Sequence, residues 1–207
     1  MSRFYDSSKD SLTLMHERYF KYMVILGIPM GVGITLLADK IMLLLGGSGY
    51  IQSIIALQIL IWTMVLTFIG ASFVQLLQSI NKQLIITKIS IICVIFNIAL
   101  NLVIIPKYSY IGASVVTVLT EILLVGYIIW TSYKLGYGIH FKVVVDSVSK
   151  TLFATLIMSV LIWYLKDLNL FILIILATLL YFITLYLIKG VDDKDILIVK
   201  EILNKNK

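Results

Sequence analysis

Two asparagines and a glutamate lie inside apolar stretches, where amide and ionisable side chains are costly. Asn97 and Asn101 are four residues apart, so they share one face of a helix. Glu121 lies well inside the apolar stretch that starts near Ile111. At about 1.5 Å per residue its carboxyl group is roughly 15 Å deep, near the middle of a bilayer. A carboxyl group there either has a function, as a proton acceptor or as the partner of a cationic group, or it locks two helices by a hydrogen bond.

Three further polar side chains are candidates for a site within the membrane. Lys40 can extend its ammonium group toward water, whereas Asp39 is the better candidate for facing a polar interior. Gln58 is expected about two turns below the outer surface, where lipid offers its amide no partner. It either contacts a substrate or joins two helices.

Pro29 interrupts the first apolar stretch in the sequence GIPMGVG. Proline removes a backbone donor, so we expect a kink there, and Gly27 with Gly31 forms a small-xxx-small surface. Pro29 and Gly31 are therefore either a packing kink or a hinge.

Residues with catalytic or metal-binding spacing are not found. There is no nucleophile–base pair, paired carboxylates or Cys/His cluster, and GGSGY lacks the Lys-Ser/Thr of a phosphate-binding loop. His16 and His140 are expected in water-facing loops without ligand spacing. The sequence predicts no catalytic residues, no metal, no cofactor and no enzyme activity.

Composition predicts an all-α integral membrane protein, because 60% of the residues are hydrophobic and only 14% are charged. A spanning helix needs about 20 apolar residues. We expect six transmembrane helices, at residues 22–45, 51–77, 84–105, 111–130, 151–165 and 168–188. Asp146 and Lys150 favour a late start for the fifth, although it could begin as early as Val143.

Positive charges predict the orientation. All Lys and Arg residues except Lys40, Lys107 and Lys166 fall in the segments that would face the cytoplasm if the amino terminus does. This asymmetry predicts a multi-pass protein of the cell membrane with both termini cytoplasmic. The net charge of +6 follows this topology and is not a nucleic-acid signal.

With these residues placed, the chain resembles the C-terminal part of a polysaccharide (O-antigen-type) flippase of the multidrug/oligosaccharidyl-lipid/polysaccharide exporter superfamily. The resemblance lies in SRFYDSSKDSL, LGIPMGVG, LLGGSGYIQSIIALQIL and, above all, NLVIIPKYSYIGASVVTVLTE. Ser109 replaces the family's usual Gly after Tyr, and Ser114 replaces an Ala.

The resemblance implies a larger protein of about fourteen helices, in two six-helix lobes plus a final pair, that moves a lipid-linked sugar headgroup across the membrane by alternating access. The six helices here would be the last six: a cytoplasmic leader (1–21), four helices of the C-terminal lobe (22–135), the final pair (136–188) and an amphipathic tail (189–207). A truncated or split gene product is the simplest account, with a separate chain as a possible source of the other helices.

On this resemblance the expected partners are membrane lipid and a polyprenyl- or dolichyl-linked oligosaccharide, and nucleic acid is not expected. In this family basic residues hold pyrophosphate, a role that only Lys40 could take in this chain. Two alternatives stay open. One is a multidrug or cation antiporter of the same superfamily, and the other is a non-transporting remnant or subunit that completes another chain.

Overall fold

The structure, a computed structural model, describes residues 9–190, and these form helices joined by short turns. The helices are α2 (Lys9–Gly46), the 3-10 helix η1 (Gly47–Ser53), α3 (Ile54–Ser79), α4 (Gln83–Lys134), α5 (Phe141–Tyr164) and α6 (Leu170–Leu187). No strand occurs within 9–190. The all-α expectation is confirmed. The expected amphipathic helix of the tail falls almost entirely outside the described residues.

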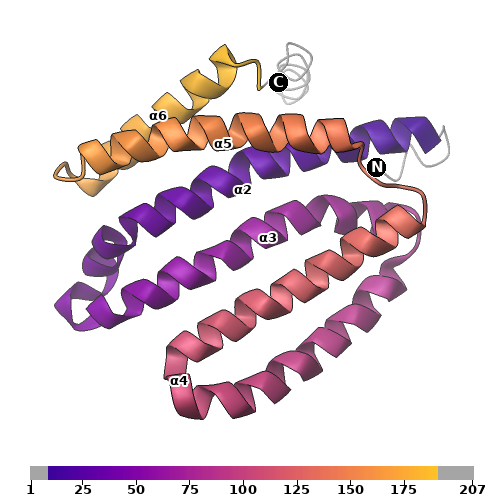
Figure 1. The fold of residues 1–207 in the computed structure, drawn as a ribbon, viewed down its shortest axis with the longest axis horizontal. Helices are drawn as coiled ribbons and strands as arrows, with labels where there is room; N and C mark the ends of the chain where they lie inside the picture. Colours follow the sequence, from indigo (N-terminus) through magenta and orange to yellow (C-terminus); the bar gives the residue numbers. More distant parts are fainter. Residues whose placement is uncertain (1–8, 191–207) are drawn as a thin grey trace, which may run out of the picture.

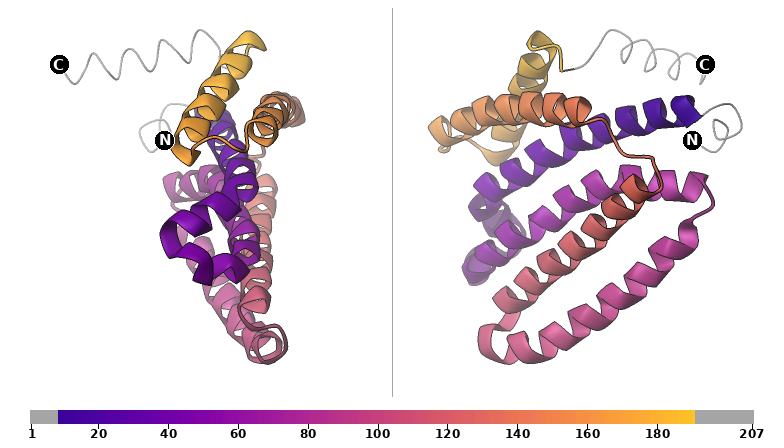
Figure 2. Two further views of the ribbon diagram at one scale, coloured as in Figure 1. Left: turned by 90° about the vertical axis from the view of Figure 1, so that its left-hand side faces the viewer. Right: turned by 45° about the vertical axis from the view of Figure 1, so that its right-hand side comes forward.

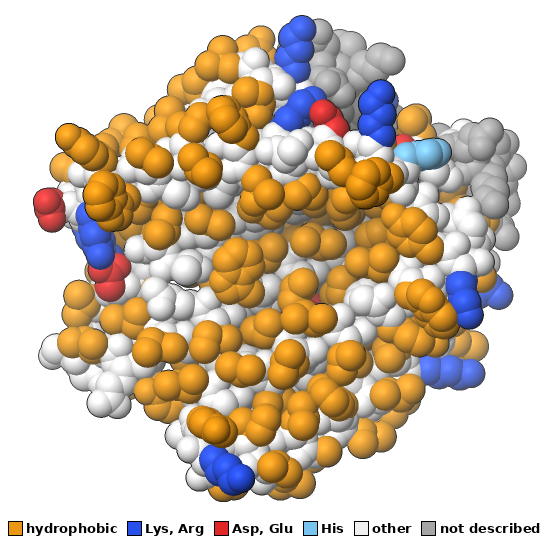
Figure 3. All heavy atoms as spheres, in the orientation of Figure 1, with side chains coloured by type: hydrophobic (Ala, Val, Ile, Leu, Met, Phe, Trp, Pro, Cys, Tyr) orange, Lys and Arg blue, Asp and Glu red, His pale blue; other side chains and the backbone are white. Residues whose placement is uncertain are grey.

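Length and composition make four helical segments suitable for crossing a membrane: Ser11–Ser79, Gln83–Lys134, Phe141–Tyr164 and Leu170–Leu187. The first of these includes α2, η1 and α3, and the second is the whole of α4. Hydrophobic side chains dominate the face in Figure 3, and charged side chains lie mainly at its edges. A surface of this kind suits lipid or another apolar protein surface rather than water.

The helices lie side by side in the order α6, α5, α2, α3, α4 (Figure 1). One hydrophobic cluster joins α2, α3 and the two ends of α4, and includes Phe20, Phe73 and Leu76. A second joins α2, α5 and α6, and includes Met158, Leu173 and Tyr181. The two clusters place α2 at the centre of the fold, between α3 and the α5–α6 pair.

Helix α4 is a hairpin, as expected from its proline-containing turn. Figures 1 and 2 show its two arms running back along each other beyond α3. The chain reverses at Ser109, whose φ of 50° and ψ of −140° are not helical, three residues after Pro106. Gly112 then allows a close approach, because a Cβ atom there would lie 2.6 Å from Ile104 Cγ2.

The conformation of Ser109 explains why glycine suits this position. A positive φ with an extended ψ is accessible to glycine and costs other residues of order 1–3 kcal/mol. We therefore expect Ser109→Gly to stabilise the protein by about 1 kcal/mol, measured as a higher midpoint of thermal unfolding in detergent. Ser90→Gly is the matched control, because it makes the same change within a helical part of α4. It should lower the midpoint, since glycine is a poor helix former.

Two predicted boundaries are wrong. Helix α2 begins at Lys9 instead of residue 22, because Leu12, His16 and Phe20 recur at a spacing of four and are buried. His16 is fully buried and packs edge-on against Phe73 at 4.7 Å, so it does not lie in a water-facing loop.

Helix α5 begins at Phe141, so Asp146 and Lys150 lie within it and not before it. Lys150 Nζ donates to Asp146 Oδ2 at 2.8 Å, one helical turn away, and also to the Lys189 carbonyl. This pairing satisfies both charges within the helix, which the sequence interpretation did not foresee.

Candidate functional site

A chain of amide and hydroxyl groups joins the two arms of α4 inside the apolar region. Asn101 Nδ2 donates to Asn97 Oδ1 at 2.9 Å, and Asn97 Nδ2 donates to Thr120 Oγ1 at 2.9 Å. Thr120 donates onward to the Val116 carbonyl at 2.8 Å. The shared face predicted for Asn97 and Asn101 is therefore present, and it points toward the opposite arm.

Asn101 carries an unused acceptor at the end of this chain. Its Oδ1 is buried and has no hydrogen-bond partner among the described residues. A buried polar atom without a partner costs about 1–3 kcal/mol. Such an atom is a natural contact point for a donor supplied by a substrate, a cation or another protein segment.

Glu121 faces α3, on a side of the second arm different from that of Thr120. Its Oε1 lies 2.7 Å from Thr67 Oγ1, and Thr67 also donates to the Thr63 carbonyl at 2.9 Å. A hydroxyl has one proton, so Thr67 cannot donate to both acceptors at once. A protonated Glu121 can donate to Thr67 while Thr67 donates to Thr63, whereas an ionised Glu121 must compete with that carbonyl.

Asp39 and Lys40 contact a different part of the molecule. Lys166 Nζ lies 3.1 Å from Asp39 Oδ2, and Lys40 Nζ donates to the Leu168 carbonyl. Both partners belong to the turn between α5 and α6. The structure therefore does not bring Asp39 and Lys40 together with the polar residues of α4, and it uses them to hold the end of α2 to that turn.

Gln58 joins α3 to α2, since its Nε2 donates to the Thr35 carbonyl at 3.1 Å. This contact matches the helix-joining alternative for Gln58. Its other alternative, a substrate contact, stays a prediction.

Pro29 is coupled to α6 by a bond that the sequence interpretation missed. Pro29 has no N–H to donate to the carbonyl of Ile25, four residues earlier. The hydroxyl of Tyr181, from α6, donates to that carbonyl at 2.7 Å. Tyr181 is only 2% exposed, so the substitute donor is held in the core. A tyrosine in an apolar helix far along the chain carries no local signal of this role.

Gly31 lies at a close approach between α2 and α3, because a Cβ atom there would lie 2.3 Å from Val65 Cγ2. Around the same turn, α2, α5 and α6 border an apolar groove of about 520 Å³, lined in part by Pro29, Gly33 and Tyr181. The predicted hinge residues thus lie between a tight contact on one side and an open groove on the other.

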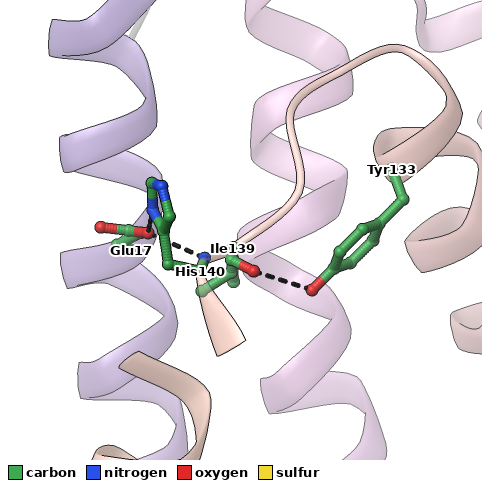
Figure 4. Close-up of polar contacts among 4 residues, drawn as sticks. All are labelled: Glu17, Tyr133, Ile139 and His140. Carbon is green, nitrogen blue, oxygen red and sulfur yellow. Dashed lines mark hydrogen bonds and ion pairs between the residues drawn. The ribbon is translucent and has the colours of Figure 1, made fainter. Parts of the chain in front are cut away.

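Hydrogen bonds between Glu17 and His140 fasten the linker between α4 and α5 to α2 (Figure 4). Glu17 Oε1 accepts from the His140 backbone N–H at 3.0 Å and lies 2.6 Å from His140 Nδ1. Tyr133 donates its hydroxyl to the Ile139 carbonyl at 3.0 Å. His140, which was expected in a water-facing loop without ligand spacing, therefore positions the start of α5. Within residues 9–190 no three His, Cys, Asp or Glu residues gather closely enough to hold a metal ion.

Comparisons with known proteins define the class to which the fold belongs. No family model matches the sequence. The fold is similar to that of the lipid II flippase MurJ in its inward closed conformation, with a TM-score of 0.70 and 18% identity over 91% of this chain. At this identity the likeness shows a shared fold. The chain is thus a multi-pass, all-helical membrane protein with a MurJ-like fold.

One curated relative is similar in sequence. It is the uncharacterized membrane protein MJ1068 of Methanocaldococcus jannaschii, which is 32% identical over 128 residues, or 61% of this chain. The chain spans 25% of that relative and 41% of the MurJ chain.

Proposed function

We propose that this chain is the C-terminal portion of a flippase that moves a lipid-linked oligosaccharide or polysaccharide precursor across the cell membrane. The observation that carries the proposal is the combination of a MurJ-like fold with a carboxyl group and an amide chain inside the apolar arms of α4. Polar groups at membrane depth are expensive and mark substrate or ion pathways more often than not.

In this proposal the chain crosses the membrane six times, with α2, α3, the two arms of α4, α5 and α6 as the spans. Both termini are cytoplasmic, as the distribution of Lys and Arg supports. Alternating access needs two repeats that move around a shared site. Helices beyond those of this chain complete that site, supplied by a further polypeptide segment or a separate chain.

The residues have distinct roles in the cycle. Glu121 exchanges a proton, or pairs with a cationic group, and changes its bond with Thr67 as it does so. Asn97 and Asn101 offer the sugar headgroup amide donors and the unused Asn101 acceptor. The apolar groove bordered by α2, α5 and α6 takes part of the lipid tail. Lys40 can reach a pyrophosphate only after leaving the Leu168 carbonyl.

The test is export in the cells that encode the chain. Deleting the gene should lower surface polysaccharide and leave lipid-linked precursor in the inner leaflet. The Glu121→Ala variant should fail to restore export, because it removes the exchangeable proton, whereas Glu121→Asp should restore part of it. Losing a proton-transfer or charge contact in the membrane is expected to reduce export at least tenfold. The measurement is surface polysaccharide per cell at matched protein level.

The matched control is Leu119→Ala, which shortens an exposed apolar side chain two residues away and should restore export fully. Full export with Glu121→Ala would contradict a coupling role and favour the structural alternative for Glu121. Normal export in the deletion, with a loss of dye efflux, would identify the antiporter instead. No change in either assay would identify a non-transporting subunit or remnant.

A further inference from the structure

A second apolar groove lies between the two arms of α4, and its lining includes none of the residues to which the proposed function assigns a role. Its volume is about 520 Å³. Ile89, Cys93 and Phe96 line it from the first arm, and Tyr127 and Trp130 from the second. All of these side chains are apolar or aromatic, so the groove suits hydrocarbon.

The shape of the groove favours a single hydrocarbon chain. From Phe96 to Ile89 the first arm rises about 10 Å, at about 1.5 Å per residue. A volume of about 520 Å³ over that length corresponds to a cross-section of about 50 Å². A helix with its side chains is at least 10 Å wide, which is roughly 80 Å². A helix could insert only side chains here, whereas an acyl chain could lie in the groove along its whole length.

A positive charge lies at the mouth of the groove. Lys134 Nζ is 4.1 Å from the centroid of the Trp130 ring, so a cation–π contact holds the ammonium group next to a residue that lines the groove. Lys88 is a second exposed cation, directly before Ile89. None of the residues in the described part of the chain that line the groove is acidic. Figure 3 shows basic side chains at the edge of this apolar face, on the right.

We propose that this groove binds an anionic phospholipid, with one acyl chain between the arms of α4 and the phosphate beside Lys134. Tryptophan prefers the level of the headgroups, which places the mouth where a phosphate would lie. A lysine near an anionic surface contributes about 1 kcal/mol, equivalent to about a fivefold preference over a zwitterionic lipid. The site goes beyond the proposed function and does not depend on it.

Trp130 provides a direct readout, because bromine on an acyl chain quenches tryptophan fluorescence on contact. The chain has three tryptophans, so Trp62→Phe with Trp163→Phe leaves Trp130 as the single reporter. The full chain is placed in phosphatidylcholine vesicles that contain a small fraction of either brominated phosphatidylglycerol or brominated phosphatidylcholine. At equal mole fraction, brominated phosphatidylglycerol should quench Trp130 about fivefold more effectively.

Two variants test the parts of the site separately. Lys134→Gln should bring the two lipids to equal quenching, whereas Lys142→Gln, an exposed lysine outside the groove, should leave the preference unchanged. Gly126→Leu should reduce quenching by both lipids, because it fills the groove from the second arm. A Cβ atom at Gly126 meets nothing within 4 Å, so this variant should fold normally.

Equal quenching by the two lipids in the unaltered groove would overturn the proposal, since the site would then have no preference for anionic lipid. Absence of quenching by both would also overturn it, because the groove would then be filled by another protein segment. A single-tryptophan variant that retains only Trp62 should be quenched equally by the two lipids, which controls for insertion into the vesicles.

Discussion

Replacing Gly31 by leucine should destabilise the protein by about 3 kcal/mol or more, seen as a lower midpoint of thermal unfolding in detergent. The reason is the contact between α2 and α3, where a Cβ atom at Gly31 would lie 2.3 Å from Val65 Cγ2. Val65 is buried and β-branched, so it has few other rotamers to adopt. The added side chain must therefore push the two helices apart.

Gly33→Leu is the matched control, because it makes the same substitution in the same helix two residues further on. A Cβ atom there meets only Met158 Cε, at 3.7 Å, and Gly33 borders the open groove between α2, α5 and α6. This variant should change the unfolding midpoint little. A double mutant with smaller substitutions completes the test. Gly31→Ala alone should destabilise the protein, and adding Val65→Ala should restore stability by removing the clashing methyl group. Equal losses at Gly31 and Gly33 would contradict close packing of α2 on α3.

The second large effect is expected at Tyr181. Truncation to alanine should cost about 3–5 kcal/mol, as for other large core side chains. Tyr181→Phe keeps the ring and removes only the hydroxyl, which leaves the Ile25 carbonyl without its donor. The expected loss is about 1–3 kcal/mol, again measured as the unfolding midpoint.

A double-mutant cycle separates this bond from the packing of the ring. Pro29→Ala restores the backbone N–H that normally donates to the Ile25 carbonyl. In that background Tyr181→Phe should cost less than in the unaltered protein, with a coupling of about 1 kcal/mol. The same cost in both backgrounds would show that the hydroxyl does not substitute for the missing backbone donor. Tyr186→Phe, on an exposed tyrosine of the same helix, is the control and should be neutral.

The Gly31–Val65 and Tyr181–Ile25 contacts show how the predicted hinge in α2 packs against α3 and α6. Pro29 weakens α2, Gly31 brings α2 against α3, and Tyr181 ties the weakened turn to α6. If the α5–α6 pair moves relative to α2, the hydrogen bond from Tyr181 to the Ile25 carbonyl must either break or move together with both helices. Whether Pro29 and Gly31 act as a hinge during transport stays a proposal, which the Tyr181→Phe variant can test in the export assay.

Much of the fold could be predicted from the sequence, because the signals are local. Long apolar runs require helices, since backbone groups in lipid must be satisfied within the segment. Pro106 and the small residues after it mark the reversal in α4. The Asn97–Asn101 spacing predicts a shared polar face, and the structure has that face directed toward Thr120.

The predicted start of α2 at residue 22 was wrong because the charged residues before it were taken to lie outside the helix. Residues 11–21 are polar enough to suggest a leader, yet one side of this segment packs against α3 and buries His16. Amphipathic extensions of this kind carry a weaker hydropathy signal than the span they prolong. The late start expected for α5 had the same cause, since Asp146 and Lys150 satisfy each other within the helix.

The sequence by itself determined that this chain is a helical membrane protein with a reversal near Pro106 and polar groups inside its apolar helices. Only the tertiary structure decided which groups meet. Tyr181 reaches Ile25 across 156 residues, Glu17 reaches His140 across 123, and Asp39 pairs with Lys166. The physical reason is that hydropathy and backbone chemistry act along the chain, whereas these partners are chosen by which helix faces pack together.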